Sequence, residues 1–112
     1  MTSDPLLTKW YKQYNKKYFN NDLPVENVIL CWEPIPEHDA LCSKIYEADT
    51  DKDTGDFLIR IDPMYVSSER ISRLTLLHEM LHIKLWPYVS HGDRFQKEMI
   101  MLAVAGAFKK LW

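Results

Sequence analysis

Residues 77–82 read LHEMLH and lie near the middle of the last long apolar stretch of the chain. The two histidines of this segment, His78 and His82, are four residues apart, so on a helix both imidazoles project from one face and can reach one metal ion. Glu79 can reach over the open side of that ion toward a water molecule. The segment therefore predicts part of a hydrolytic metal centre, provided that it is helical.

The flanking residues favour a helix over about residues 68–86. Ser67 or Ser68 can cap its N-terminus, and Pro87 forbids its continuation. Glu69 suits the first turn of a helix, where the dipole favours negative charge. Apolar residues recur at helical spacing and cover almost the whole circumference, so we expect a central, buried helix. They are Ile71, Leu74, Leu76, Leu77, Met80, Leu81, Ile83, Leu85 and Trp86.

Length and charge limit the classes of protein. The chain has 112 residues, which is enough for one domain with one core. It carries 14 Lys and Arg against 16 Asp and Glu, a net charge of -2, so DNA binding is not supported by net charge and would have to be local. No basic leader and no apolar run of about 20 residues is present, which predicts a cytoplasmic protein without a membrane partner. Cys31 and Cys42 are expected to be buried thiols rather than metal ligands.

The N-terminal part predicts a helix followed by a strand. Asp4 resembles a helix cap and Pro5 a first helical residue, and the helix is expected to end at about Asn20. A stripe of lysines on its polar side is better explained as a solvated face than as a DNA-binding surface. The β-branched and aromatic residues of 25–32 then predict the first strand.

Two further strands are expected at residues 40–48 and 57–62, joined by a polar hairpin loop over residues 49–56. The alternating aspartates of this loop suggest a calcium-binding loop, but Thr54 and Arg60 occupy the positions that require glycine and glutamate. A final helix follows Asp93, its expected cap. The order of helix, three strands and two helices predicts an α+β domain spanning residues 1–112, with a mainly antiparallel sheet.

A catalytic zinc ion needs three protein ligands and an open position, and His91 is the preferred third ligand because Pro87 lets the chain fold back. Glu98 is the alternative, but it would leave His91 unexplained. In another zinc-binding pattern the third histidine follows a glycine, which would require glycine at position 85 and histidine at position 88. This sequence has Leu85 and Tyr88, so that pattern is excluded. His38, isolated in a loop, is expected to face solvent.

Together these segments resemble the SprT-like metallopeptidases. Residues 78–82 read HEMLH and, after eight further residues, 91–95 read HGDRF, similar to the family pattern in which the third ligand belongs to an HGxxF or HGxxW segment. Residues 14–24, YNKKYFNNDLP, are similar to the family's N-terminal YN…F…LP segment. Many relatives also carry a C-terminal zinc ribbon with four cysteines, which this sequence does not contain.

The resemblance implies a zincin-like domain, one Zn²⁺ ion held by His78, His82 and His91, Glu79 as the catalytic base, and proteolysis. Its eukaryotic relatives of the Spartan type degrade proteins crosslinked to DNA, so the expected substrate is a protein or peptide, including DNA-associated proteins. The metal would activate water for attack on a peptide bond while Glu79 takes its proton. An exposed sheet edge could hold an extended substrate.

Three residues near His91 in the sequence are candidates for supporting roles. Tyr88 and Arg94 could stabilise the transition state, or they could simply pack or pair at the surface. Asp93 could orient a ligating imidazole instead of capping the final helix. Two other functions remain open: a non-catalytic, zinc-stabilised binding or accessory domain, and a small DNA-binding domain that uses the lysine face of the first helix.

Overall fold

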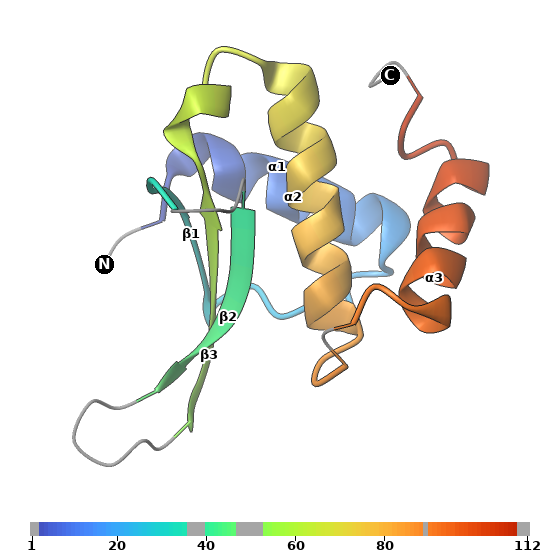
Figure 1. Cartoon of the computed structure of the whole chain (residues 1–112), viewed down its shortest axis with the longest axis horizontal. Helices are drawn as coiled ribbons and strands as arrows, with labels where there is room; N and C mark the ends of the chain where they lie inside the picture. Colours follow the sequence, from blue (N-terminus) through green and yellow to red (C-terminus); the bar gives the residue numbers. More distant parts are fainter. Residues whose placement is uncertain (1–2, 36–39, 47–52, 89, 110–112) are drawn as a thin grey trace.

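A computed structural model describes residues 3–35, 40–46, 53–88 and 90–109. The elements in these ranges are α1 (Pro5–Tyr18), β1 (Val28–Trp32), β2 (Ala40–Tyr46), β3 (Asp53–Ile61), the 3-10 helix η1 (Pro63–Tyr65), α2 (Glu69–Lys84) and α3 (Asp93–Val104). The expected α+β class, with one helix before three strands and two helices after them, is confirmed (Figure 1).

Helix α1 begins and ends close to the expected positions. The carboxylate of Asp4 accepts a hydrogen bond of 2.9 Å from the backbone N–H of Leu7, which caps the helix as expected. The helix ends at Tyr18, and the next two asparagines, Asn20 and Asn21, take the left-handed conformation with φ of 53° and 60°. The inward face of α1 is buried in the core, and its lysines lie on the exposed side.

The sheet is mixed, which corrects the prediction of a mainly antiparallel sheet. Its strand order is β1-β3-β2, with β1 parallel and β2 antiparallel to β3. The prediction assumed that strands adjacent in sequence also pair. Instead β3 takes the central position, where Phe57, Ile59 and Ile61 are buried against the helices. Strands β1 and β2 are consecutive in the sequence but lie on opposite sides of β3 in the sheet.

The strand boundaries differ from the expected ones in the polar segments. Strand β1 starts at Val28 rather than at residue 25, and β2 ends at Tyr46. Strand β3 starts at Asp53, four residues before the expected start, because its antiparallel pairing with β2 continues to Tyr46↔Asp53. Residues 53–56 are therefore strand rather than loop. The rest of that predicted loop, and His38, lie outside the described residues.

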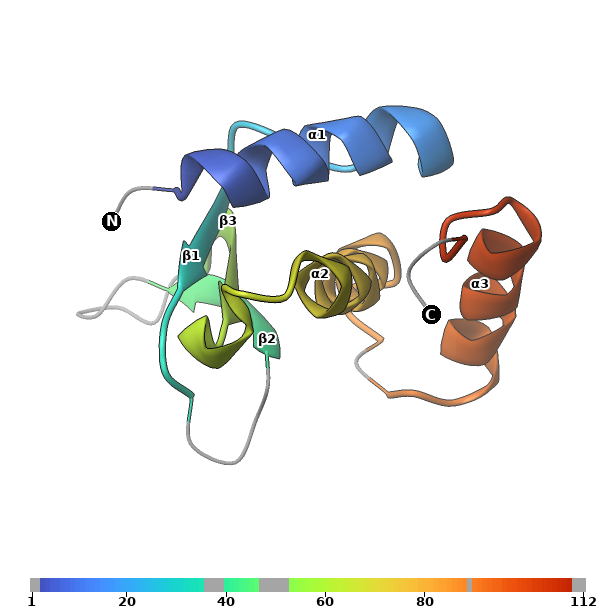
Figure 2. The same cartoon turned by 90° about the horizontal axis from the view of Figure 1, so that it is seen from above.

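Helix α2 is the centre of the fold and lies between the sheet and α3 (Figure 2). It also contacts α1 and η1. The hydroxyl of Ser68 caps its N-terminus, and the helix ends at Lys84, just before Pro87. Four of its apolar side chains have no exposed surface, which confirms the expected central, buried helix: Leu76, Leu77, Met80 and Leu81. Ile71 is an exception, with 37% of its surface exposed.

Helix α3 makes its main contact with α2. Gly92 is its N-cap and makes no side-chain capping bond, so the expected cap at Asp93 is wrong, and Asp93 is the first helical residue. Phe95 and Leu102 form its buried side.

In the described part of the chain Cys31 and Cys42 form no disulfide, and both are half-buried rather than buried. Within these same ranges, no helix has the length and apolar character needed to cross a bilayer.

Candidate metal centre

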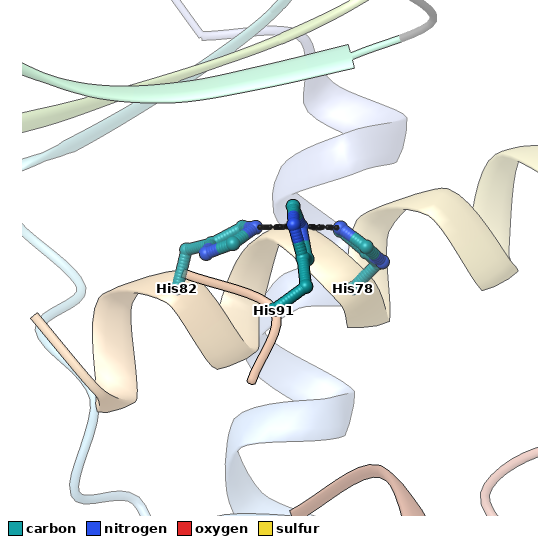
Figure 3. A group of neighbouring side chains, drawn as sticks. All are labelled: His78, His82 and His91. Carbon is teal, nitrogen blue, oxygen red and sulfur yellow. Dashed lines mark hydrogen bonds between the residues drawn. The ribbon is translucent and has the colours of Figure 1, made fainter. Parts of the chain in front are cut away.

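Three histidines from two neighbouring segments converge at one point (Figure 3). His78 and His82 lie one turn apart on α2, as their spacing predicts. His91 precedes the Gly92 cap of α3, and the connection between the helices brings its ring back over α2. His82 is 9% exposed, whereas His91 is exposed to solvent. The centre is therefore closed on the side of the core and open on the side of His91.

The distances between the three rings fit a single metal ion. The Nε2 atoms of His78 and His91, and those of His82 and His91, are 3.1 Å apart, and those of His78 and His82 are 3.3 Å apart. Two nitrogens at about 2.0–2.1 Å from a tetrahedral zinc ion would be separated by about 3.3 Å. The three residues could thus hold one metal ion with their Nε2 atoms.

Hydrogen bonds alone cannot account for this triangle of nitrogens. In a neutral imidazole, Nε2 is either a donor or an acceptor, so among three such atoms at least two have the same role. At least one of the three short contacts would then join two donors or two acceptors. A cation between the three lone pairs removes this conflict, and the chemistry of the donor set therefore fits a metal ion.

The surroundings keep the imidazoles in the neutral form that binds metals. Burial, with smaller contributions from the neighbouring His82 and His91, lowers the pKa of His78 to about 4. Burial, followed by the effect of His91, also lowers the pKa of His82. Near neutral pH both rings are therefore uncharged and can donate a lone pair without first losing a proton.

Phe95 packs against all three histidines. Its ring centroid lies 4.8 Å from the ring of His78, 5.0 Å from that of His82 and 4.8 Å from that of His91. Phe95 itself is 5% exposed. No hydrogen bond to an Nδ1 atom of these histidines occurs among the described residues, so ring packing, rather than polar partners, orients the imidazoles here.

Glu79 lies beside the histidines, between α2 and strand β2. Its side chain is 5% exposed, and burial raises its pKa to about 7. A hydrogen bond from the backbone N–H of Cys42 in β2 acts in the opposite direction and lowers that pKa. A carboxylate with this pKa can accept a proton and release it again near neutral pH, which is what a general base requires. Strand β2 passes over the three histidines (Figure 3).

Comparisons with known proteins identify no relative. No protein-family model, curated protein or solved structure matches this chain. A function therefore has to be inferred from the geometry and chemistry of the residues themselves.

The structure does not join the other candidate residues to the histidines. The guanidinium of Arg94 lies 4.1 Å from the centre of the Tyr88 ring, and both side chains are exposed. Among the described residues no hydrogen bond links Asp93 to a histidine. The carboxylate of Glu98 accepts a hydrogen bond of 2.7 Å from Lys84 and lies outside the group of three potential ligands.

Two features of the centre were not predicted from the sequence. One is the contact of Phe95 with the histidines, for which its position four residues after His91 was the available signal. The hydrogen bond from Cys42 to Glu79 joins residues 37 positions apart, from a strand to a helix. Nothing in the local sequence of either element indicates that pair.

Proposed function

We propose that this chain is a zinc-dependent metalloendopeptidase of the SprT-like type with a zincin-like fold. The observation that supports this most directly is the convergence of three histidine Nε2 atoms within 3.1–3.3 Å beside a buried glutamate. Two histidines and the glutamate come from one helix, and the third histidine comes from the segment that follows it. This arrangement agrees with the sequence resemblance carried by the HEMLH and HGDRF segments.

Zinc is the metal that we propose for this site. Three imidazole nitrogens with this spacing would hold the ion and would leave a fourth position for water or substrate, the pattern of catalytic zinc sites. A bound zinc ion would supply Lewis acidity, which polarises a carbonyl group and lowers the pKa of water. Because imidazole also binds copper, iron and nickel, the metal content of the purified protein must be measured.

Glu79 is the proposed general base. Its carboxylate would accept a proton from the attacking water and later pass it to the nitrogen of the leaving amine. Its burial beside β2 supports this role. A carboxylate that is shielded from bulk solvent exchanges its proton with bound water and substrate rather than with the surrounding water. The N–H of Cys42 would hold the carboxylate in one orientation.

Strand β2 provides the proposed substrate-binding edge. Within the described residues it pairs with β3 on one side only, and it passes over the histidines and contacts α2. An extended peptide placed along such an edge is held by backbone hydrogen bonds, which tolerate many sequences. This supports a protein or peptide substrate, and the sequence resemblance adds DNA-associated proteins as a proposed class.

The test compares the wild-type protein with a Glu79→Gln variant in the cleavage of casein, a disordered protein. Both proteins should contain one zinc ion per chain, measured by elemental analysis. We expect the variant to be slower by a factor of about 10²–10⁴, because it lacks the base but keeps the shape of the side chain. Addition of single-stranded DNA tests whether DNA increases the rate.

The competing proposal is a non-catalytic, zinc-stabilised binding or accessory domain. One observation favours it: His91 adjoins α3, and a metal ion would tie this helix to α2, with which it makes its main contact. In that case wild type and Glu79→Gln would both hold one zinc ion and be equally inactive. That result would reject the enzyme and leave the metal site intact.

A further inference from the structure

A concave site lies away from the histidines. It is a cleft of about 640 Å³ between the C-terminal part of α1, the first turns of α2 and the segment that follows α3. Figure 2 shows that this last segment turns back from α3 toward the other two helices. Arg73 is the lining residue of α2 nearest to the ligands in sequence, and it precedes His78 by five residues, about 7.5 Å along the helix and about 140° around it. The cleft is thus distinct from the metal centre.

The walls of the cleft concentrate positive charge. Among the described residues, four cationic side chains line it: Lys17 from α1, Arg70 and Arg73 from α2, and Lys109 from the segment after α3. Glu69 is the one carboxylate among these described lining residues. The chain as a whole has a net charge of -2, so this cluster is opposite in sign to the whole molecule. Like charges gathered in a concave surface repel one another, and a bound anion would relieve that repulsion.

Arg73 is held in place before any ligand binds. Its Nε donates a hydrogen bond of 2.5 Å to the hydroxyl of Tyr14, and its guanidinium lies 5.3 Å from the centre of the same ring. A further contact of 3.5 Å joins Nη1 to the carboxylate of Glu69. A guanidinium fixed in this way loses little conformational freedom when it binds a planar or tetrahedral anion. The other three cations are exposed and can move to meet a ligand.

The size and composition of the cleft indicate the ligand class. A volume of about 640 Å³ lies within the range of about 300–1,000 Å³ for small-molecule sites, and a single phosphate ion would fill only part of it. The rings of Tyr14 and Tyr18 lie in the lining among the cations, and Lys17 lies 5.4 Å from the centre of the Tyr18 ring. Arginine and lysine together are the usual partners of phosphate groups.

We propose that this cleft binds an organic phosphate of about nucleotide size, with its phosphate groups on Lys17, Arg70, Arg73 and Lys109. The site does not depend on the metal centre. The same chemistry could come from a free nucleotide or from a nucleotide unit of a single-stranded nucleic acid.

Isothermal titration of the zinc-loaded protein tests the proposal with four probes: ATP, inorganic pyrophosphate, a ten-nucleotide single strand of DNA and a hexaglutamate peptide. The cleft variant is Lys17→Ala with Arg70→Ala, which leaves the structural Arg73 unchanged. The matched control is Lys9→Ala with Lys12→Ala, which removes two exposed charges from α1 outside the cleft. A third variant, Glu69→Gln, removes the carboxylate from the lining.

We expect the cleft variant to bind ATP at least about tenfold more weakly and the control to change the affinity by less than about twofold. Glu69→Gln should bind ATP more tightly. Tighter binding of the DNA strand than of ATP, with the same response to the variants, would support a nucleic-acid source, and the reverse order would support a free nucleotide.

Three results would overturn the proposal. The first is that neither ATP nor the DNA strand binds below millimolar concentration. The second is that the control weakens binding as much as the cleft variant, which would mean a diffuse surface effect. The third is that pyrophosphate or hexaglutamate binds more tightly than both nucleotide probes, since an inorganic or carboxylate anion would then be the preferred ligand. Circular dichroism of each variant verifies that the fold is retained.

Discussion

Phe95 is the common neighbour of the three histidines at the metal centre. Its ring lies 4.8–5.0 Å from each imidazole, and it comes from the first turn of α3, four residues after His91. Metal sites often orient their histidines through hydrogen bonds to the second ring nitrogen. Here the described residues provide ring packing instead, so the geometry of the site depends on an apolar side chain.

Replacing Phe95 by alanine should therefore weaken metal binding. We expect about a tenfold loss of zinc affinity, comparable to the effect of removing the outer partners of metal ligands in other proteins. The measurement is a competition titration against a chromophoric chelator. With the weaker cobalt ion, the visible absorption spectrum should also change, because the rings are no longer held in one orientation.

The control for Phe95→Ala is Leu102→Ala. Leu102 is also buried on α3, with 4% of its surface exposed, and its loss should destabilise the protein by about 2–5 kcal/mol. It belongs to a different turn of the helix from Phe95. If Leu102→Ala lowers zinc affinity as much as Phe95→Ala, the effect comes from loss of stability alone, and the positioning role of Phe95 is wrong.

At the scale of elements, the buried side chain of Asn15 helps to join α1 to the segment before β1. Asn15 is 1% exposed, and its amide donates a hydrogen bond of 2.9 Å to the carbonyl of Leu23 and accepts one of 3.0 Å from its N–H. Asn15→Ala would leave both backbone groups of Leu23 without their partner. Since each unsatisfied buried group costs about 1–3 kcal/mol, we expect a loss of about 2–4 kcal/mol in the free energy of unfolding.

Urea denaturation measures this loss, and Asn27→Ala is the matched control. Asn27 also bonds a distant backbone carbonyl, that of Gly55 at 2.7 Å, but in an exposed position. Water can replace that bond, so the control should cost less than about 1 kcal/mol. Equal losses in the two variants would show that burial does not set the contribution of Asn15.

Local chemistry made the helices predictable, but the pairing of the strands could not be predicted in this way. Asp4, Ser68 and Pro87 set helix ends through contacts within a few residues, and the spacing of the histidines on α2 follows from the helical period alone. The parallel register Val28↔Phe57 joins residues 29 positions apart, and no short-range signal specifies it. The extension of β3 to Asp53 has the same cause, since pairing with β2 overrides the turn preference of a polar segment.

The candidate metal centre also has a part that local sequence predicts and a part that it does not. The HEMLH spacing and the break at Pro87 were enough to predict that His91 would join His78 and His82. The placement of Glu79 under strand β2 depends on how the sheet packs on α2, and the sequence contains no local signal for it. The unpredicted contact of Glu79 therefore joins two distant elements, at the place where the proposed substrate would lie.

At the scale of the whole molecule, the group of three histidines bridges α2 and the segment just before α3. Among the described elements the main contact of α3 is with α2, and one ion pair of 2.7 Å, between Lys84 and Glu98, adds a polar link. Such an exposed pair contributes only about 0–1 kcal/mol. A metal ion held by His78 and His82 on α2 and by His91 next to α3 would be a much stronger connection between the two helices.

Removal of the metal should therefore loosen α3 before it affects the sheet. A zinc ion that binds only the folded protein would stabilise it by about 2.7 kcal/mol at a free concentration one hundred times its dissociation constant. We expect EDTA to lower the melting temperature and to raise hydrogen exchange in α3 by at least about tenfold more than in β3, measured by mass spectrometry. His82→Ala should show the fast exchange without EDTA and no further change with it, whereas Lys84→Ala should leave α3 protected while zinc is present. Equal increases in α3 and β3 would mean that the metal stabilises the domain as a whole and does not act as a specific tie between the last two helices.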